Sequence, residues 1–163
     1  MAGPHTLAET ENLVQSRLSD MQLDFQAMAV TSNLFRAANA VRNHLERTVL
    51  APADLTWTAF VVLWVAWIWQ TAETRMIAEE SGVSKATLSG VLSTLEGRGL
   101  VTRRRGETDG RLVIVELTPA GKRLMKRLFP KFNEQEQAVC SLIPADQQEL
   151  AAQFLRSFVR ATS

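Results

Sequence analysis

The chain has 163 residues, of which 46% are hydrophobic and 21% charged, and its formal net charge is +1. This length fits one domain, and the composition is that of a folded globular protein rather than a disordered or low-complexity chain. One cysteine and two histidines cannot supply a disulfide framework or a multi-cysteine metal site. We therefore expect no metal and no cofactor.

Basic residues are concentrated between Arg98 and Arg127. This 30-residue window holds nine of the 18 lysines and arginines and only three acids, so its charge is +6, whereas the rest of the chain carries −5. Such asymmetry favours a polyanionic partner for one surface, with an ordinary solvated face as the alternative.

The N-terminal residues show no basic and apolar secretory signal, and a single cysteine is typical of a reducing compartment, so we expect a cytoplasmic protein. The segment 55–72 is uncharged over 18 residues and contains all four tryptophans, a length at the edge of a membrane span. Thr56, Thr58, Gln70 and Thr71 interrupt its apolar character. We favour the central buried helix of a soluble fold and expect no contact with membranes.

The predicted elements follow one another along a single domain, residues 1–163. Residues 1–19 are expected to form a loose arm or frayed helix. Residues 20–50 have helical spacing with two apolar stripes, of which the second could pack against another subunit. Three helices and a hairpin are expected within 54–118, and further helices, interrupted at Pro144, within 119–160.

A helix-turn-helix is indicated by two helices predicted at about 73–81 and 84–96. Gly82 is placed where the turn needs a positive φ, and Ser84 is a good N-cap for the second helix. Such a motif puts its second helix in the DNA major groove. Most of the residues expected to face outward carry short hydroxyl side chains, which suit phosphates and base edges. These residues are Ser84, Lys85, Thr87, Ser89 and Ser93. The alternative is an ordinary solvated helix face.

A two-stranded hairpin is predicted next, because the apolar period changes to two around a glycine-containing turn. Arg103, Arg104 and Arg105 enter this hairpin and Arg111 leaves it. Arginines at a hairpin tip can enter the negatively charged minor groove, and Asp109 could orient the Arg111 guanidinium. Thr118 and Pro119 then predict the start of a helix.

The runs 78–89 and 95–101, the wing sequence Asp109-Gly110-Arg111 and the sequence Leu117-Thr118-Pro119-Ala120-Gly121 resemble the MarR family of bacterial transcription regulators. The resemblance implies a winged helix-turn-helix at 54–118, with an N-terminal dimerisation helix at 20–50 and C-terminal dimerisation helices at 119–160. The expected fold is therefore mainly α with a small β-hairpin wing. Family members often carry Arg at the position of Gly90 and an acidic residue at that of Ser93, so detailed base contacts do not transfer.

The resemblance also implies a function: a homodimer that grips a palindromic operator in double-stranded DNA, most often as a repressor released by a small aromatic or phenolic effector. The alternatives are a regulator without such an effector, or a winged helix used only for contacts with proteins. An enzyme is not expected and no catalytic residue is assigned. The chain has no glycine-rich phosphate loop or metal-ligand cluster, and its only base near a nucleophile would be His44.

The candidate effector-binding residues are aromatic. Trp57, Phe60 and Trp64 share one face of the predicted tryptophan-rich helix, and His44 lies near the end of the preceding helix, close to where the resembled family binds ligands. Core packing is the alternative interpretation of these rings. Cys140 is expected to be a buried, inert thiol, with redox sensing as the alternative.

Overall fold

Residues 6–106 and 112–162 are described in the computed structural model, and the chain divides into two units, residues 1–43 and 44–163. The described chain is mainly helical with one small antiparallel sheet, which confirms the predicted fold class.

The first unit contains helix α1 (Leu7–Arg17) and most of helix α2 (Phe25–Leu45). A capping box starts α1: the Thr6 hydroxyl accepts from the Glu9 N–H at 3.1 Å, and the Glu9 carboxylate accepts from the Thr6 N–H at 2.7 Å. These bonds hold the pKa of Glu9 below its ordinary value. The Asn33 amide donates to Glu11 at 2.6 Å and ties the two helices together. The expectation of a loose arm or frayed helix at 1–19 is therefore wrong for residues 7–17.

The junction after α2 is irregular. The helix loosens into a π-helical turn, η1 (Glu46–Leu50), followed by a 3₁₀ turn, η2 (Ala51–Ala53). Pro52 cannot continue the α-helical bonding, and Asp54 takes a left-handed conformation with φ 54°. Thr56 then caps helix α3 (Trp57–Ile68), its hydroxyl accepting from the Ala59 N–H at 3.2 Å. The predicted helix at 20–50 thus begins five residues later, at Phe25, and its last five residues form the π-helical turn η1.

Helix α3 forms the centre of the second unit. Phe60, Val62, Leu63 and Val65 are all buried on it, and it packs against α4 (Thr74–Ser81), α5 (Lys85–Gly97) and α6 (Pro119–Cys140). Burial on several sides explains why this segment carries no charge. Among the described residues, no single helix is both long and apolar enough to cross a membrane; α3 meets that criterion only as a bent pair with the preceding segment Phe25–Ala53.

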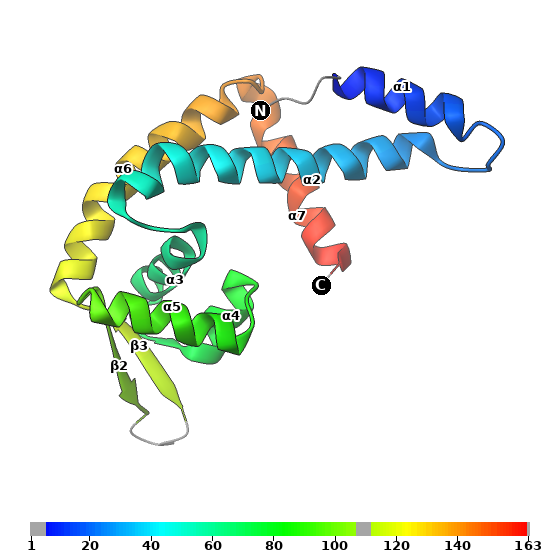
Figure 1. Ribbon diagram of the computed structural model, residues 1–163. Helices are drawn as coiled ribbons and strands as arrows, with labels where there is room; N and C mark the ends of the chain where they lie inside the picture. The colour runs from blue at the N-terminus through cyan, green and yellow to red at the C-terminus, as the bar shows by residue number, and fades with distance from the viewer. Residues whose placement is uncertain (1–5, 107–111, 163) are drawn as a thin grey trace. The chain divides into compact units, whose positions relative to one another are not determined.

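The sheet has three strands in the order β1-β3-β2: β1 (Ala72–Glu73), β2 (Val101–Arg105) and β3 (Val113–Leu117). Strands β2 and β3 form the predicted hairpin, with Val101 opposite Leu117 and Arg105 opposite Val113. Figure 1 shows this hairpin projecting from the helices of its unit. Strand β1 was not predicted, because two residues are too few to show an alternating pattern.

Helix α6 starts against the turn that follows α5. Thr118 caps it by accepting from the Gly121 N–H at 3.0 Å, while its own hydroxyl donates to the Gly99 carbonyl at 2.6 Å. Gly121 is buried so closely on the Leu100 backbone that an added Cβ would overlap the Leu100 carbonyl oxygen. The Leu-Thr-x-x-Gly sequence therefore joins α6 to the end of the helix-turn-helix.

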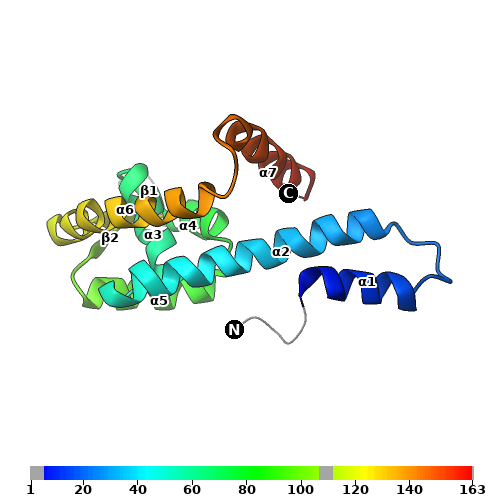
Figure 2. The same ribbon diagram turned by 90° about the horizontal axis from the view of Figure 1, so that it is seen from above.

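The last helix, α7 (Gln148–Thr162), follows the 3₁₀ turn η3 (Ala145–Gln147). In Figure 2 it stands clear of α3, α4 and α5. Its apolar face is open to solvent in the protomer: Leu150, Phe154, Leu155 and Val159 are each more than half exposed.

Candidate nucleic-acid interface

The turn between α4 and α5 positions the candidate recognition helix. Gly82 adopts φ 64°, as its place in the turn predicts, and the Ser84 hydroxyl caps α5 by accepting from the Thr87 N–H at 3.1 Å. Ile77 on α4 and Leu92 on α5 are fully or almost fully buried. Because these side chains fix one face of α5 to the core, its opposite face is directed outward.

All five residues predicted to face DNA from this helix are exposed: Ser84, Lys85, Thr87, Ser89 and Ser93. The Ser84 and Thr87 hydroxyls also lie 2.9 Å apart, so they form one local hydrogen-bonded pair at the start of the helix. Gly90 lies on the exposed face too, with no atom within 4 Å of the position that a Cβ would take. The exposed face of α5 therefore carries short polar side chains, one lysine and one glycine.

The three consecutive arginines of β2 are not equivalent, because side chains of a strand alternate between its two faces. Arg103 shares the face of the buried Val101 and is bound by Glu96 of α5, through its Nε at 3.0 Å and a second, shorter contact. Arg104 lies on the other face and pairs with Glu116 of β3 at 2.9 Å. Arg105, at the end of the strand, is exposed. Asp109 and Arg111 of the predicted wing tip lie outside the described residues.

The Glu96–Arg103 pair connects the recognition helix to the wing. The hydrogen bond from Arg103 holds the pKa of Glu96 below its ordinary value. A carboxyl group with a pKa depressed by folding stabilises the folded state above its unfolded pKa, about 4.3, and loses that contribution as the pH falls through its folded pKa.

We expect Glu96→Gln to be less stable than the parent protein at neutral pH and nearly equal to it in strong acid. Urea unfolding of both proteins at several pH values between 3 and 7 measures this difference. It should be constant above about pH 5 and shrink below about pH 4. A difference independent of pH would mean that the carboxylate charge contributes nothing at this position.

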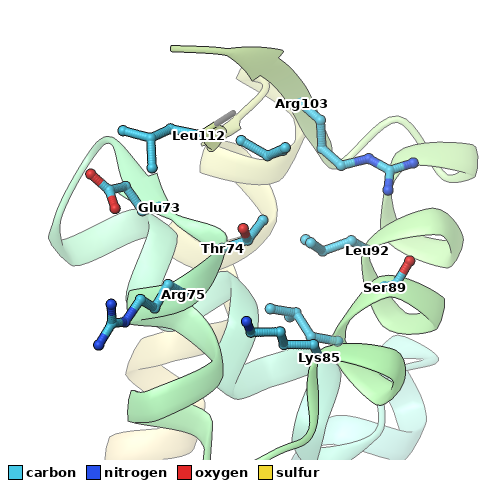
Figure 3. Close-up of a pocket in the computed structure, with 10 residues that line it drawn as sticks. Glu73, Thr74, Arg75, Lys85, Ser89, Leu92, Arg103 and Leu112 are labelled. Atoms are coloured by element: carbon cyan, nitrogen blue, oxygen red, sulfur yellow. The ribbon is translucent and has the colours of Figure 1, made fainter. Parts of the chain in front are cut away.

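A cavity of about 370 Å³ lies between α4, α5 and the wing. Figure 3 shows Lys85, Ser89 and Leu92 of α5 on one side of it, and Thr74 and Arg75 of α4 on another. Arg103 of β2 and Leu112, which precedes β3, lie at its edge. Three of the predicted DNA-contacting residues, Lys85, Ser89 and Arg103, therefore line one hollow. Its floor is apolar and its rim is polar.

The candidate effector residues gather against α6. Phe60 is only 4% exposed and stacks on Phe132 with ring centroids 4.3 Å apart, while Trp57 contacts both rings. Trp64 stacks on Phe129 at 4.6 Å. Phe132 lies on the apolar face that helical spacing predicts for this segment and is buried as expected. The sequence does not single out Phe129, although it lies three residues from Phe132 on the same helix.

His44 lies beside the same helix, since its Nε2 is 2.9 Å from Oε1 of Gln135 on α6. The structure thus brings His44 and the aromatic residues of α3 to neighbouring turns of α6. Phe60 and Phe132 are buried in this arrangement and Trp57 and Trp64 are half-buried, so the rings already fill much of the space between α3 and α6.

Cys140 at the end of α6 is exposed, so the expectation of a buried thiol is wrong for the protomer. The apolar residues around it in the sequence suggested burial, but the helix ends there and no core element covers it. In the described part of the chain, no three His, Cys, Asp or Glu side chains are grouped as a metal site would require.

Comparison with known proteins identifies the family. The model of the MarR family matches residues 55–113, which span α3 to the start of β3. An uncharacterised HTH-type transcriptional regulator of Bacillus subtilis, YwaE, is 36% identical over 153 residues, covering 92% of this chain and 90% of the relative. The chain belongs to the MarR family. A second relative, an organic hydroperoxide resistance transcriptional regulator of B. subtilis, is 28% identical over 81 residues, or 50% of this chain and 55% of that protein.

Solved structures of MarR-family proteins share the fold. A MarR mutant from Escherichia coli complexed with operator DNA has a TM-score of 0.72 at 21% identity, covering 82% of this chain and 96% of the other. NadR in complex with 4-hydroxyphenylacetate has a TM-score of 0.69 at 22% identity, covering 79% and 91%. Membership of the MarR family makes this chain a relative of transcriptional regulators rather than of enzymes.

Proposed function

We propose that this protein is a homodimeric transcription regulator that binds a palindromic operator in double-stranded DNA and represses transcription until a small aromatic effector releases it. The observation that carries the proposal is the exposed face of α5, where a capped helix held by a buried core presents hydroxyls and Lys85 to solvent. Membership of the MarR family supports the proposal. A regulator that binds a bacterial operator would act in the cytoplasm, where the DNA is.

The proposed DNA contacts divide by chemistry. Ser84, Lys85, Thr87, Ser89 and Ser93 of α5 would enter the major groove, where hydroxyls reach base edges and the lysine neutralises a phosphate. Arg105, with Asp109 and Arg111 of the wing tip, would contact the minor groove. Arg103 and Arg104 are also proposed contacts, but each must exchange its carboxylate partner, Glu96 or Glu116, for a phosphate.

The proposed dimer interface uses the exposed apolar face of α7. Its large side chains, Leu150, Phe154, Leu155 and Val159, recur at helical spacing and are each more than half exposed in the protomer. The part of α2 in the first unit also exposes large apolar groups, among them Phe35 at 72%. An exposed apolar helix face such as that of α7 marks an interface between proteins.

We expect Phe154→Asp to shift the protein from dimer to monomer, because the carboxylate would lose its hydration in a self-complementary apolar contact. Sedimentation velocity over a range of concentrations measures the change. Gln153→Asp serves as the matched control, because Gln153 is exposed on the same helix but beside the polar Glu149, and this variant should remain dimeric. A Phe154→Asp protein that stays dimeric at low concentration would exclude α7 from the interface.

An effector is proposed to bind between α3 and α6. NadR was solved in complex with 4-hydroxyphenylacetate. The structure of BpsR from Bordetella bronchiseptica concerns the regulation of its DNA binding by 6-hydroxynicotinic acid. Both compounds are aromatic acids. In this chain Trp57, Phe60 and Trp64 offer ring faces, and His44 offers a hydrogen bond to a phenol or carboxylate. Because Phe60 is buried against Phe132, an effector must displace one of these rings or enter beside the half-buried tryptophans.

The proposed function is tested by selecting fragments from random duplex DNA with the purified protein and sequencing those retained. A pseudo-palindrome with half-sites about 10 base pairs apart is expected, since a twofold dimer places two recognition helices one helical turn apart. No enriched sequence at about 50 mM salt, where phosphate attraction is strong, would instead favour a winged helix that contacts only proteins.

A further inference from the structure

A groove in the second unit is lined by three arginines and shares no residue with the proposed DNA-contacting or effector-binding sets. It has a volume of about 560 Å³ and runs between η2, the end of α5 and the start of α6. Arg98, Arg123 and Arg127 line it beside the apolar or small residues Pro52, Ala53, Leu100, Ala120 and Leu124, so its lining is part polar and part apolar. A smaller hollow of about 210 Å³ adjoins it through Pro52, Ala53, Leu124 and Arg127 and adds Lys131.

The cations of this groove are poorly neutralised. Asp54 is the one acidic residue among those lining it, and its carboxylate is 94% exposed and 3.6 Å from Arg98. Within the described residues, no carboxylate lies within 4.0 Å of Arg123, Arg127 or Lys131. Helix α6 carries no acidic residue between Pro119 and Lys131. The positive potential of this face is therefore open to an anion.

The hydrogen-bond acceptors of Arg98 are neutral carbonyl groups, which bind a guanidinium less strongly than an anion does. It stands at the C-cap of α5, and its guanidinium donates to the backbone carbonyl oxygens of Asp54 and, at 3.3 Å, Ala53. These bonds join the end of the recognition helix to the η2 turn. A guanidinium binds a carboxylate or phosphate more strongly than a neutral carbonyl, and two of its donors can bind in parallel.

We propose that this groove binds a small organic oxyanion, a carboxylate or phosphate attached to an apolar body. Arg98, Arg123 and Arg127 hold the anionic group, and the apolar body lies on Pro52 and Leu124. Binding draws the Arg98 guanidinium from the Ala53 and Asp54 carbonyls and loosens the junction between α5 and η2. The resulting loss of DNA affinity rests on the proposed function; the binding step does not.

Calorimetric titration of the full-length protein with phenyl phosphate, in the absence of DNA and at low ionic strength, tests the binding step. Arg127→Ala should weaken binding about tenfold, the effect of removing one charge-assisted hydrogen bond. Arg127→Lys should recover part of the loss. Lys126→Ala is the matched control, because Lys126 is an exposed cation of the same helix turn that does not line the groove, and it should bind as the parent does.

Three results would overturn the proposal: no binding of phenyl phosphate by the parent protein, unchanged binding by Arg127→Ala, or equal weakening by Lys126→Ala, which would mean diffuse attraction to a basic face.

A second measurement, of the affinity for duplexes of different length, distinguishes a groove that binds a small anion from one that contacts DNA flanking the operator. If Arg127→Ala binds a short operator normally but binds a longer duplex less tightly than the parent, the groove contacts the DNA backbone instead. If the parent binds phenyl phosphate but no duplex of any sequence, the proposed function fails while the groove assignment stands.

Discussion

Gly121→Ala is expected to destabilise the protein by about 3 kcal/mol, the upper part of the usual range for overpacking a core. The added Cβ would overlap the Leu100 carbonyl oxygen and would also lie 3.1 Å from the Leu100 carbonyl carbon and 3.3 Å from Cγ of Leu117. The backbone atoms cannot rotate away as a flexible side chain can. The start of α6 must therefore move, which strains the Thr118 bonds to the preceding turn. Urea unfolding followed by circular dichroism measures the loss.

Gly90→Ala provides the matched control for this prediction. Gly90 also lies within a helix, but no atom lies within 4 Å of its added Cβ. Alanine has the higher helix propensity, so this variant should gain about 0.5–1 kcal/mol. A loss of stability at Gly121 together with a gain at Gly90 cannot arise from helix propensity alone, because propensity favours alanine at both positions. If Gly121→Ala is as stable as the parent protein, the close approach of α6 to Leu100 is not maintained in solution.

Lys85→Ala is expected to weaken operator binding at least about tenfold and to reduce the dependence of affinity on salt. Lys85 is exposed at the first turn of α5, beside the Ser84 cap. Each phosphate contact contributes about 0.9 to the slope of log affinity against log salt concentration. A dimer loses two such contacts, so the slope should fall by about 2. Fluorescence anisotropy with a labelled operator duplex between about 50 and 200 mM salt measures both quantities.

Lys85→Arg keeps the charge and should retain most of the affinity and the full salt slope. Circular dichroism and unfolding of both variants establish that α5 remains formed. An Ala variant with a lower affinity but an unchanged slope would assign Lys85 to a base edge rather than to a phosphate. Unchanged affinity would remove α5 from the DNA interface and favour the alternative of a protein-contacting winged helix.

Much of the local structure was predictable because it depends on neighbouring residues. Ser84, Thr118 and Gly82 act within one turn of the chain, and the structure has the first two at N-caps and the third in the left-handed region, as expected. The capping box of Thr6 and Glu9 is equally local and is a signal for the start of α1, where only a loose arm or frayed helix was expected. Pro52 likewise indicates the break before α3, whereas helical spacing does not indicate the π-helical turn at Glu46–Leu50.

Some features of the candidate site also depend on neighbouring residues, and others depend on contacts between distant segments. The outward face of α5 followed from helical periodicity, since the apolar residues Leu88, Leu92 and Leu95 leave the hydroxyls on the other side. The separate directions of Arg103 and Arg104 required their partners, Glu96 on α5 and Glu116 on β3. The stacking of Phe129 and Phe132 on the tryptophan-rich helix likewise joins residues about 70 positions apart.

By itself, then, the sequence determined the helix-turn-helix and the hairpin, because periodicity, caps and turn residues act over a few residues. Its motifs carried the resemblance to the MarR family. Tertiary structure alone decided which arginines are paired, that Phe60 is buried beneath Phe132, and that Arg98 reaches the carbonyls of η2. These features depend on distances between segments remote in the chain, and such distances are fixed only when the elements pack into one core.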